Sequence, residues 1–311
     1  MNTIDRISLI GLGAIGMSFG EKIQAVYPDK LRVIADKTRV ERYRQQPFAV
    51  NGKSVPFQFE TPEQAAGPAD LLLVAVKHHH LADTMDAMAP YVGVNTTILS
   101  LMNGITSEEI IGQRFGMEKM LHGVCVGIDA VRDGQETTYQ TMGKIYFGEK
   151  SNLTLSPRVQ AVKSLFDAAD IPYEIPEDML KIMWWKFMAN VGINQPSAVL
   201  EANYGAFQAI PELNELMEET MKEVMTLANA MGIGLTQQDI DKFHDIINSF
   251  APEGKTSMLQ DIEAGRKTEV EMLAGTMIEL GEKHKVPTPY NRMLFHLIRT
   301  KEKMNELREQ E

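Results

Sequence analysis

The chain has 311 residues and only one cysteine, Cys125, so no disulfide bond can form within it. Such a chain is typical of a reducing compartment, and we expect a cytoplasmic protein. Cys125 lies in a short apolar run, which indicates a buried structural thiol rather than a reactive one. The single cysteine therefore excludes a fold held together by internal disulfide bonds.

Long apolar runs and an excess of positive charge are also missing. No stretch approaches the roughly 18 apolar residues of a membrane-spanning helix. The formal net charge is −11, and a field of that sign repels the phosphate backbone of nucleic acids. We therefore expect neither a membrane nor a nucleic acid as partner. A local positive pocket for an anionic substrate stays compatible with this charge.

The first half of the chain alternates short apolar strands with helices. Its apolar runs are nearly continuous, which is typical of parallel strands covered on both faces. This order predicts a doubly wound α/β domain of the Rossmann type. Strands are expected at 6–10, 31–35, 71–76, 97–101, 120–131, 144–147 and 173–175, and helices at 14–26, 81–89, 107–115 and 156–169.

After Pro176 the pattern changes to helices alone. A chain of this length also favours two domains over one. We therefore predict a dinucleotide-binding Rossmann domain over residues 1–176 and an all-α substrate and catalytic domain over residues 177–311. Helices of the second domain are expected at 179–200, 213–231, 237–249, 257–264, 269–284 and 292–309.

A glycine-rich motif, Gly11-Leu12-Gly13-Ala14-Ile15-Gly16, directly follows the first strand and opens the first helix. Gly11 permits a tight turn, Gly13 lets the backbone approach a pyrophosphate, and Gly16 allows the helix to pack closely on the strand. The N–H groups at the helix start, those of Ala14 and Ile15 among them, are free to bind the anion. This context favours a dinucleotide cofactor over an unliganded glycine-rich turn.

The residues after the second strand leave the choice of cofactor open. Asp36 ends that strand, and an acidic residue there usually accepts a hydrogen bond from the ribose 2′-hydroxyl, which favours NAD. Lys37, Arg39 and Arg42 follow at once, and cations in this position can hold the 2′-phosphate of NADP. A charged start of a surface helix explains the same residues without any ligand.

Four polar residues interrupt an otherwise apolar helix in the second domain. Lys186, Asn190, Asn194 and Ser197 are spaced by four, four and three residues, so they share one helical face. Burying a lysine and two amides without partners would cost several kcal/mol, so we expect this face to line a wet cleft. A solvated face of an amphipathic helix is the alternative, which a pair of tryptophans beside the lysine disfavours.

Lys186 is the candidate general acid. Reduction of a 2-oxo acid leaves an alkoxide that needs a proton, and a partly buried lysine can donate it and polarise the carbonyl beforehand. The amides of Asn190 and Asn194 can bind neutral oxygens without competing for that proton.

Taken together, these motifs resemble the ketopantoate reductase (2-dehydropantoate 2-reductase) family over nearly the whole chain. Besides the glycine-rich motif, the resemblance rests on Val76-Lys77, Asn103-Gly104, Trp185-Lys186 with the two asparagines, and Ser257-Met258-Leu259-Gln260-Asp261 followed by Thr268-Glu269. It implies that Lys77 approaches the cofactor. Asn103 would hold the nicotinamide end and contact the substrate.

In the second domain the resemblance implies that Lys186 is the catalytic acid and that Asn190 and Asn194 bind substrate. Ser257 would contact the substrate carboxylate, and Glu269 would lie near the nicotinamide ribose or the substrate hydroxyl. Read without the family, Ser257 is equally well a helix N-cap and Glu269 a surface helix residue. The run His78 to His80 is not expected to hold a metal, because adjacent side chains cannot easily converge on one ion.

The resemblance implies NADPH-dependent reduction of 2-dehydropantoate to pantoate, a step towards pantothenate and coenzyme A. The substrate is expected in a cleft between the domains, and a homodimer is one expectation. Tyr204 stands where many members carry a further asparagine, so a related reductase of another 2-oxo acid remains an alternative. Asp36 leaves NADH open as the cofactor. A non-catalytic dinucleotide sensor is the third reading, and retention of both Lys186 and Glu269 disfavours it.

Overall fold

The computed structural model describes residues 3–308 and divides the chain into two compact units, Met1–Ile182 and Met183–Glu311. The division falls inside helix α6 (Met179–Leu200). The domain boundary expected from the sequence, after residue 176, lies just before that helix. Each unit has its own set of buried hydrophobic residues.

An eight-stranded sheet forms the first unit, with the order β12-β11-β8-β7-β6-β1-β2-β5. Neighbouring strands from β5 to β8 are parallel, β11 is antiparallel to β8, and β12 is parallel to β11. This doubly wound sheet confirms the fold class predicted from the sequence. Its strands are β1 (Ile7–Ile10), β2 (Leu31–Ile34), β5 (Phe59–Glu60), β6 (Leu71–Val74), β7 (Thr97–Ser100), β8 (Met120–Val126), β11 (Lys144–Gly148) and β12 (Tyr173–Glu174).

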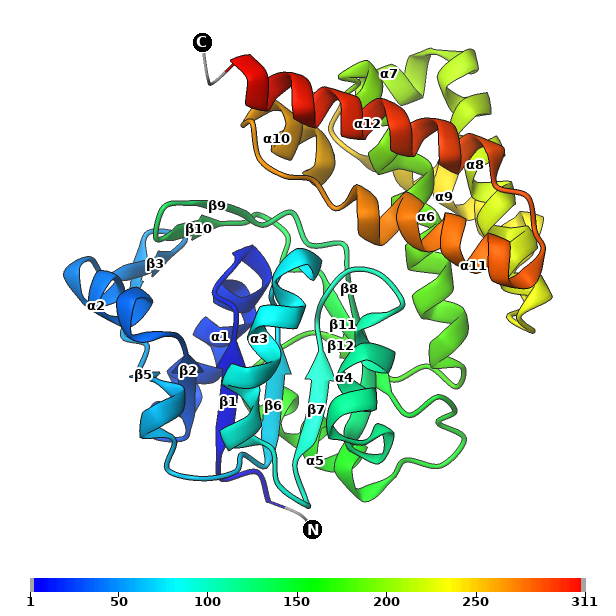
Figure 1. Ribbon diagram of the computed structural model, residues 1–311. Helices are drawn as coiled ribbons and strands as arrows, with labels where there is room; N and C mark the ends of the chain where they lie inside the picture. The colour runs from blue at the N-terminus through cyan, green and yellow to red at the C-terminus, as the bar shows by residue number, and fades with distance from the viewer. Residues whose placement is uncertain (1–2, 309–311) are drawn as a thin grey trace. The chain divides into compact units, whose positions relative to one another are not determined.

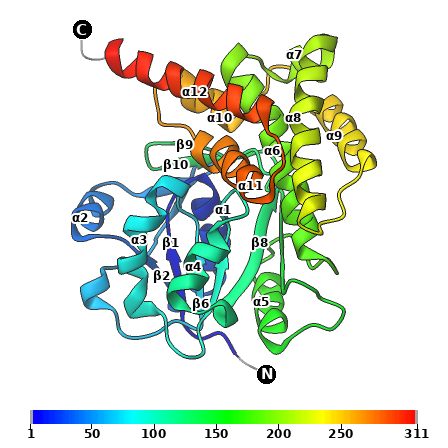
Figure 2. The ribbon, with the colours of Figure 1, turned by 45° about the vertical axis from the view of Figure 1, so that its right-hand side comes forward.

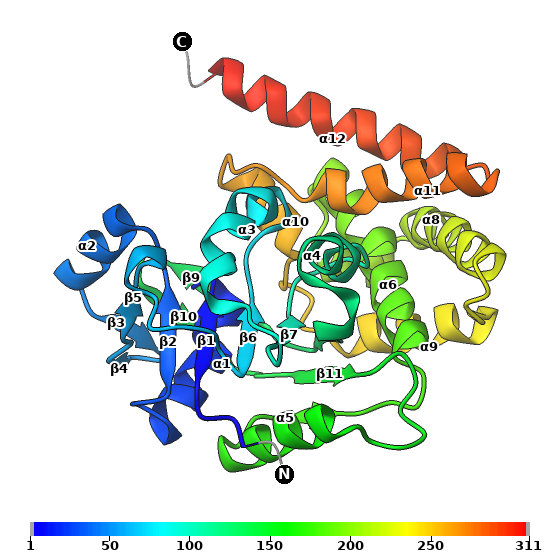
Figure 3. The same ribbon diagram turned by 60° about the horizontal axis from the view of Figure 1, so that its bottom comes forward.

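Alternate side chains of each strand enter two separate cores, one on each face of the sheet. Leu71 and Leu73 of β6 pack with helices α1 (Ala14–Val26) and α5 (Pro157–Ala168). The intervening Leu72 and Val74 pack with α3 (Leu81–Met88) and α4 (Ser107–Phe115). Figure 3 shows these helix pairs on opposite faces of the sheet. Burial on both faces explains why the strands read as continuous apolar runs.

A second, four-stranded sheet was not predicted. Its order is β4-β3-β10-β9, and it packs near α1, where Thr137 Oγ1 donates to Met17 Sδ over 3.1 Å. The expected strand 120–131 is wrong, because Gly127 adopts a φ of +74° and ends β8 before β9 begins. The strands of this sheet are β3 (Phe48–Val50), β4 (Lys53–Val55), β9 (Val131–Asp133) and β10 (Glu136–Thr138), which Figure 1 shows close to α2 (Lys37–Gln45).

Short helical turns complete the first unit. They are the 3₁₀ segments η1 (Pro62–Gln64), η2 (His78–His80), η3 (Ala89–Tyr91) and η4 (Met117–Lys119). Two of them, η2 and η3, flank α3 and bring the chain from β6 to β7.

The second unit is helical, as predicted, and residues 183–308 contain no strand (Figure 2). The expected helix 292–309 already begins at Pro289, because proline suits the first turn of a helix; Glu309 lies outside the described residues. No helix among residues 3–308 is long and apolar enough to cross a membrane. Besides α6 the helices are α7 (Tyr204–Ala209), α8 (Pro211–Ala230), α9 (Gln237–Ser249), α10 (Ser257–Glu263), α11 (Thr276–His284) and α12 (Pro289–Arg308).

A buried polar network joins three of these helices. Glu223 of α8 accepts hydrogen bonds from Tyr290 N (2.8 Å), Asn291 N (3.1 Å) and Asn291 Nδ2 (2.8 Å) at the start of α12. Gln195 of α6 donates to Asn291 Oδ1 over 3.0 Å. The carboxylate therefore satisfies N–H groups that the first turn of α12 cannot pair internally, and its charge suits the positive end of the helix.

Replacement of Glu223 by alanine is expected to lower the free energy of unfolding by about 2 to 3 kcal/mol, because it leaves three buried donors without an acceptor. The matched control is Glu215→Ala, an exposed glutamate of the same helix, which should change the free energy by less than about 0.5 kcal/mol. Urea unfolding followed by far-UV circular dichroism measures both. Equal urea midpoints for the two variants would contradict the network's role.

Candidate active site

Four of the sequence-predicted residues follow four neighbouring strands. Asn103, Lys77, Gly11 and Asp36 come after β7, β6, β1 and β2, which are adjacent and parallel in that order. Their strands' carboxyl ends therefore lie along one edge of the sheet, across about 14 Å at three strand spacings. The chain reverses its winding direction between β1 and β6, and ligands of doubly wound sheets bind outside such a switch point.

The glycine-rich turn has room for a ligand at one of its three glycines. A Cβ at Gly11, where φ is +99°, would lie 2.5 Å from Ala75 O, and a Cβ at Gly16 would lie 1.9 Å from Gly11 O. At Gly13 the nearest atom would be 3.9 Å away. Gly13 is also the N-cap of α1 without a side chain to satisfy the helix start. The N–H groups of Ala14 and Ile15 at that start suit a dinucleotide pyrophosphate.

Asp36 is engaged as the N-cap of α2. Its Oδ1 accepts from Arg39 N over 2.7 Å, and its Oδ2 lies 3.3 Å from Arg39 Nε. Asp36 and the following Lys37 are both exposed. Both carboxylate oxygens thus have partners in the first turn of α2. This arrangement fits the alternative in which these residues form the charged start of a surface helix.

Lys77 and Asn103 are both half-buried in turns that leave the sheet edge. Lys77 precedes the short helix η2, and Gly104 after Asn103 has a φ of +96°, a conformation that favours glycine. Among residues 3–308, no group of three His, Cys, Asp or Glu side chains is arranged to hold a metal ion.

A buried glutamate that the sequence did not reveal supports the turn carrying Asn103. Ser107 Oγ donates to Glu108 Oε2 over 2.9 Å and lies 2.8 Å from Ser100 Oγ, which accepts from Met102 N. Gly123 N donates to the other oxygen of Glu108. Burial raises the pKa of Glu108 to about 7. An acidic residue in the first turn of a helix is usually solvated and interacts with the helix dipole, so no sequence pattern predicts these buried hydrogen bonds.

The polar face of α6 separates into two kinds of residue. Asn190 is 7% exposed and Asn194 9% exposed, yet neither side-chain amide has a hydrogen-bond partner among residues 3–308. Lys186, one turn earlier, is half-buried. Ser197 is fully buried, donates to Ala202 O over 2.6 Å and accepts from Thr256 Oγ1 over 3.0 Å. The expectation that Ser197 lines a wet cleft is therefore wrong, because the fold satisfies its hydroxyl.

Ser257 is exposed and occupies the first position of α10. The N-cap is Thr256, whose hydroxyl accepts from Leu259 N over 3.2 Å, so the alternative that Ser257 caps this helix is wrong. The bond between Thr256 and Ser197 brings the start of α10 beside α6. Ser257 thereby lies close to the C-terminal half of the helix that carries the two asparagines.

Glu269 precedes a π-helical segment, Glu271–Gly275, that leads into α11. The helix expected at 269–284 is therefore not a regular α-helix at its start. Thr268 donates from its N–H (2.8 Å) and its hydroxyl (2.6 Å) to Glu302 of α12, which anchors the residue next to Glu269. Arg299 pairs with both Glu302 and Glu271. Such π segments are frequent at functional sites, and no sequence pattern predicted this one.

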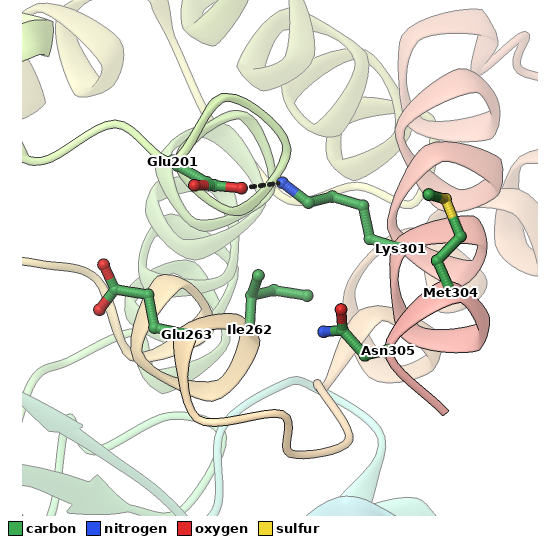
Figure 4. Close-up of a pocket in the computed structure, with 6 residues that line it drawn as sticks. All are labelled: Glu201, Ile262, Glu263, Lys301, Met304 and Asn305. Carbon is green, nitrogen blue, oxygen red and sulfur yellow. Dashed lines mark hydrogen bonds and ion pairs between the residues drawn. The ribbon is translucent and has the colours of Figure 1, made fainter. Parts of the chain in front are cut away.

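A cavity of about 280 Å³ in the second unit holds none of the candidate residues. Figure 4 shows its walls, with the ion pair between Lys301 and Glu201 at 2.9 Å. Lys301 Nζ also donates to the carbonyls of Ala198 and Val199, both at 3.1 Å. A cation at this position caps the C-terminus of α6. The residues lining the cavity are Glu201, Ile262, Glu263, Lys301, Met304 and Asn305.

Comparisons with known proteins agree with the sequence motifs. Residues 7–152 match the family model described as ketopantoate reductase PanE/ApbA, and residues 178–302 match the model of its C-terminal part. The chain is 26% identical to the 2-dehydropantoate 2-reductase of Aquifex aeolicus over 252 residues, which cover 79% of this chain and 81% of that protein.

Two solved structures are similar over almost their whole length. The 2-dehydropantoate 2-reductase of Geobacter metallireducens has a TM-score of 0.84 and 25% identity, covering 95% of this chain and 99% of that one. A D-mandelate dehydrogenase, solved with NADH and anilino(oxo)acetate, has a TM-score of 0.86 and 21% identity, covering 97% and 99%. One fold thus accommodates members with different substrates.

The two kinds of residue on α6 should respond oppositely to truncation. Asn190→Ala and Asn194→Ala should leave the free energy of unfolding unchanged or raise it, because each removes an amide that has no partner among the described residues from a helix, where alanine has the higher propensity. Ser197→Ala should lower it by about 1 to 2 kcal/mol, because Ala202 O and Thr256 Oγ1 lose their partner. Urea unfolding of the three variants checks this. A loss at the asparagines as large as that at Ser197 would mean that they are structural.

The Glu108→Gln variant tests the buried carboxyl. Because the pKa of Glu108 is about 7 in the folded chain and near 4.5 when unfolded, its stabilising contribution is present below pH 4.5 and lost as the pH rises through 7. Glutamine mimics the protonated form. The variant should therefore match the native chain near pH 4 and be more stable at pH 8, on the order of 1 to 3 kcal/mol.

The measurement is the difference in urea midpoint between the two proteins at each pH. Burial lowers the pKa of His122 to about 4, which makes stability rise with pH between about 4 and 6.5, but this effect is common to both proteins and cancels. A difference that stays constant from pH 4 to pH 8 would show that Glu108 is ionised throughout.

Proposed function

Because this chain belongs to the ketopantoate reductase family of oxidoreductases, we propose that it reduces 2-dehydropantoate to pantoate with NADPH. Residues 1–176 would bind the cofactor and residues 177–311 would supply the substrate-binding and catalytic side chains. The product places the reaction on the route to pantothenate and coenzyme A, in keeping with the expected cytoplasmic location. A homodimer is the assembly we expect.

One observation carries the substrate side of this proposal. Asn190 and Asn194 are mostly buried residues whose amides have no partner among residues 3–308, one and two turns after Lys186 on the same face of α6. Neither amide is among the fully buried atoms that lack a hydrogen bond, so both keep access to solvent and are available to a ligand that replaces water. A 2-oxo acid with a hydroxyl group, such as 2-dehydropantoate, offers the oxygens that two amides and one ammonium can bind.

Side chains of the second unit would polarise the ketone, donate the proton and orient the substrate. Lys186 donates a hydrogen bond to the 2-oxo oxygen, which polarises the carbonyl, and then gives a proton to that oxygen as negative charge develops. Asn190 and Asn194 bind the remaining neutral oxygens and orient the ketone. Ser257 contacts the substrate carboxylate, and Glu269 accepts a hydrogen bond from the substrate hydroxyl or the cofactor ribose. When bound, the reduced nicotinamide supplies the hydride.

The first unit would hold the dinucleotide along the edge formed by β7, β6, β1 and β2. Gly11, Gly13 and Gly16 shape the turn, and the N–H groups of Ala14 and Ile15 bind the pyrophosphate. Lys77 and Asn103 serve the nicotinamide half. Positive charge from Lys37 and the arginines of α2 favours NADPH over NADH, because it suits a 2′-phosphate and Arg39 offsets the charge of Asp36.

A related reductase of a bulkier 2-oxo acid is the second candidate. The expected further asparagine is replaced by Tyr204, whose ring lies 4.7 Å from that of Phe250. Asn203 does not substitute for it readily, because its Oδ1 caps α7 by accepting from Ala206 N over 3.0 Å. An aromatic pair in place of an amide would favour an apolar or aryl substituent on the 2-oxo acid.

The Lys186→Ala variant is the decisive test of the enzymatic assignment. Oxidation of NADPH with 2-dehydropantoate should slow by about 10² to 10⁴ in kcat, because the alkoxide loses its proton donor. NADPH binding, measured by fluorescence titration, should stay unchanged, because Lys186 does not belong to the cofactor-binding unit. Lys283→Ala, at an exposed lysine of α11, is the control and should turn over as the native chain does.

A variant that turns over as fast as the native chain would remove Lys186 from the mechanism. A panel of branched and aryl 2-oxo acids, each with NADPH and NADH, separates the two candidate reactions by kcat/KM. Binding of NADPH without turnover of any 2-oxo acid would instead favour the dinucleotide sensor.

A further inference from the structure

Three arginines gather in the first unit around helix α2. Arg39 and Arg42 lie on α2, and Arg132 reaches them from β9 of the second sheet. The Arg132 guanidinium packs 6.0 Å from the ring centroid of Phe48 on β3 and is half-buried. Burial lowers the pKa of Arg132, the neighbouring Tyr43 hydroxyl partly opposes this, and the positive charges of Arg42 and Arg39 lower the pKa further. The three guanidinium groups are therefore within electrostatic reach of one another.

Arg132 also contacts the turn that would bind the pyrophosphate. Its Nη1 donates to Leu12 O, between Gly11 and Gly13 of the glycine-rich motif. Its Nε donates to Gly134 O over 2.8 Å and closes the hairpin of β9 and β10. The side chain thus bridges the turn after β1 and the helix after β2. In a Rossmann domain these two segments flank the adenosine ribose of a bound dinucleotide.

Positive charge at this place exceeds the negative charge that the protein supplies. Asp36 pairs with Arg39, whereas neither Arg42 nor Arg132 forms an ion pair with any residue from 3 to 308. Helix α2 with its N-cap and Arg132 carries five cations and two carboxylates, which leaves an excess of three positive charges; these residues are Lys37, Arg39, Arg42, Arg44 and Arg132 against Asp36 and Glu41. A phosphate monoester carries about −1.5 to −2 at pH 7 and offsets most of that excess.

A purely structural role, in which Arg132 joins the second sheet to the glycine-rich turn, uses only part of the hydrogen-bonding capacity of its guanidinium. The bonds to Leu12 O and Gly134 O use two of the five N–H donors of a guanidinium. Packing on Phe48 needs only apolar surface, and a half-buried cation near two others is destabilising unless an anion joins them.

We propose that Arg132 is a specificity residue for the cofactor and that, together with Arg39 and Arg42, it binds the adenosine 2′-phosphate of NADPH. This inference rests on the proposed function, because it assigns a recognition role within the cofactor site of that reaction. Arg132 donates its remaining N–H groups to the phosphate from the side opposite α2. The unpredicted second sheet thereby contributes directly to cofactor choice.

Isothermal titration calorimetry with adenosine 2′,5′-bisphosphate and adenosine 5′-monophosphate tests this without any turnover. The native chain should bind the bisphosphate more tightly. Arg132→Gln should weaken the bisphosphate by about 10 to 100-fold, the value of a charge-assisted hydrogen bond, and leave the monophosphate nearly unchanged. Arg44→Gln, at an exposed arginine of the same helix, is the matched control and should bind both ligands as the native chain does.

Equal weakening of both ligands by Arg132→Gln would overturn the proposal, since it would show that Arg132 only supports the glycine-rich turn. Equal affinity of the native chain for the two ligands would overturn it as well. Neither ligand contains nicotinamide or a 2-oxo acid. Steady-state reduction of 2-dehydropantoate with NADH therefore reports separately on the proposed function, which survives if that reaction proceeds while the 2′-phosphate preference is absent.

Discussion

Burial of residues 187–198 of helix α6 is the constraint on which the second unit depends. Every position from Phe187 to Ala198 is buried, so each polar side chain in that stretch requires a partner or a compensating use. The fold provides partners for the amide nitrogen of Gln195, from Asn291, and for the hydroxyl of Ser197, from Thr256. The amide oxygen of Gln195 is buried without a partner among the described residues, and the amides of Asn190 and Asn194 have none there either. Tertiary contacts therefore decide which polar groups of this single helix the fold satisfies.

Those tertiary contacts could not be predicted from the sequence, whereas the bounds of several helices could. The bounds of α1, α4, α6 and α9 agree with the expected ranges, because long periodic patterns and helix-start residues are local signals. Spacing alone placed Lys186, both asparagines and Ser197 on one face, and that is correct for a helix. Whether Ser197 faces a ligand or Thr256 depends on α10, about 60 residues away, so no local pattern could separate it from the asparagines.

The second sheet shows the same limit in the first unit. Its strands β3, β4, β9 and β10 have three residues each, too few for a period of two to stand out. Their pairing, which is parallel between β3 and β10, joins segments far apart in the chain. The glycine-rich turn and the ends of β2, β6 and β7 were predictable because each lies beside an apolar run. Arg132 was not, since its relation to Leu12 exists only after that pairing.

At the predicted ligand positions of both units, polar groups without a partner among the described residues lie beside groups that hydrogen bonds hold in place. In the first unit the start of α1 is left without a side-chain cap, while the nearby turn of Asn103 is fixed by the bonded chain from Ser100 to Glu108. In the second unit the asparagines are unpaired, while Glu302 holds Thr268 beside Glu269. A free amide or N–H group discriminates a ligand only if its position is fixed before binding, because otherwise ordering it would consume the binding energy. The buried carboxylates Glu108 and Glu302 therefore hold the neighbours of predicted site residues in place by hydrogen bonds.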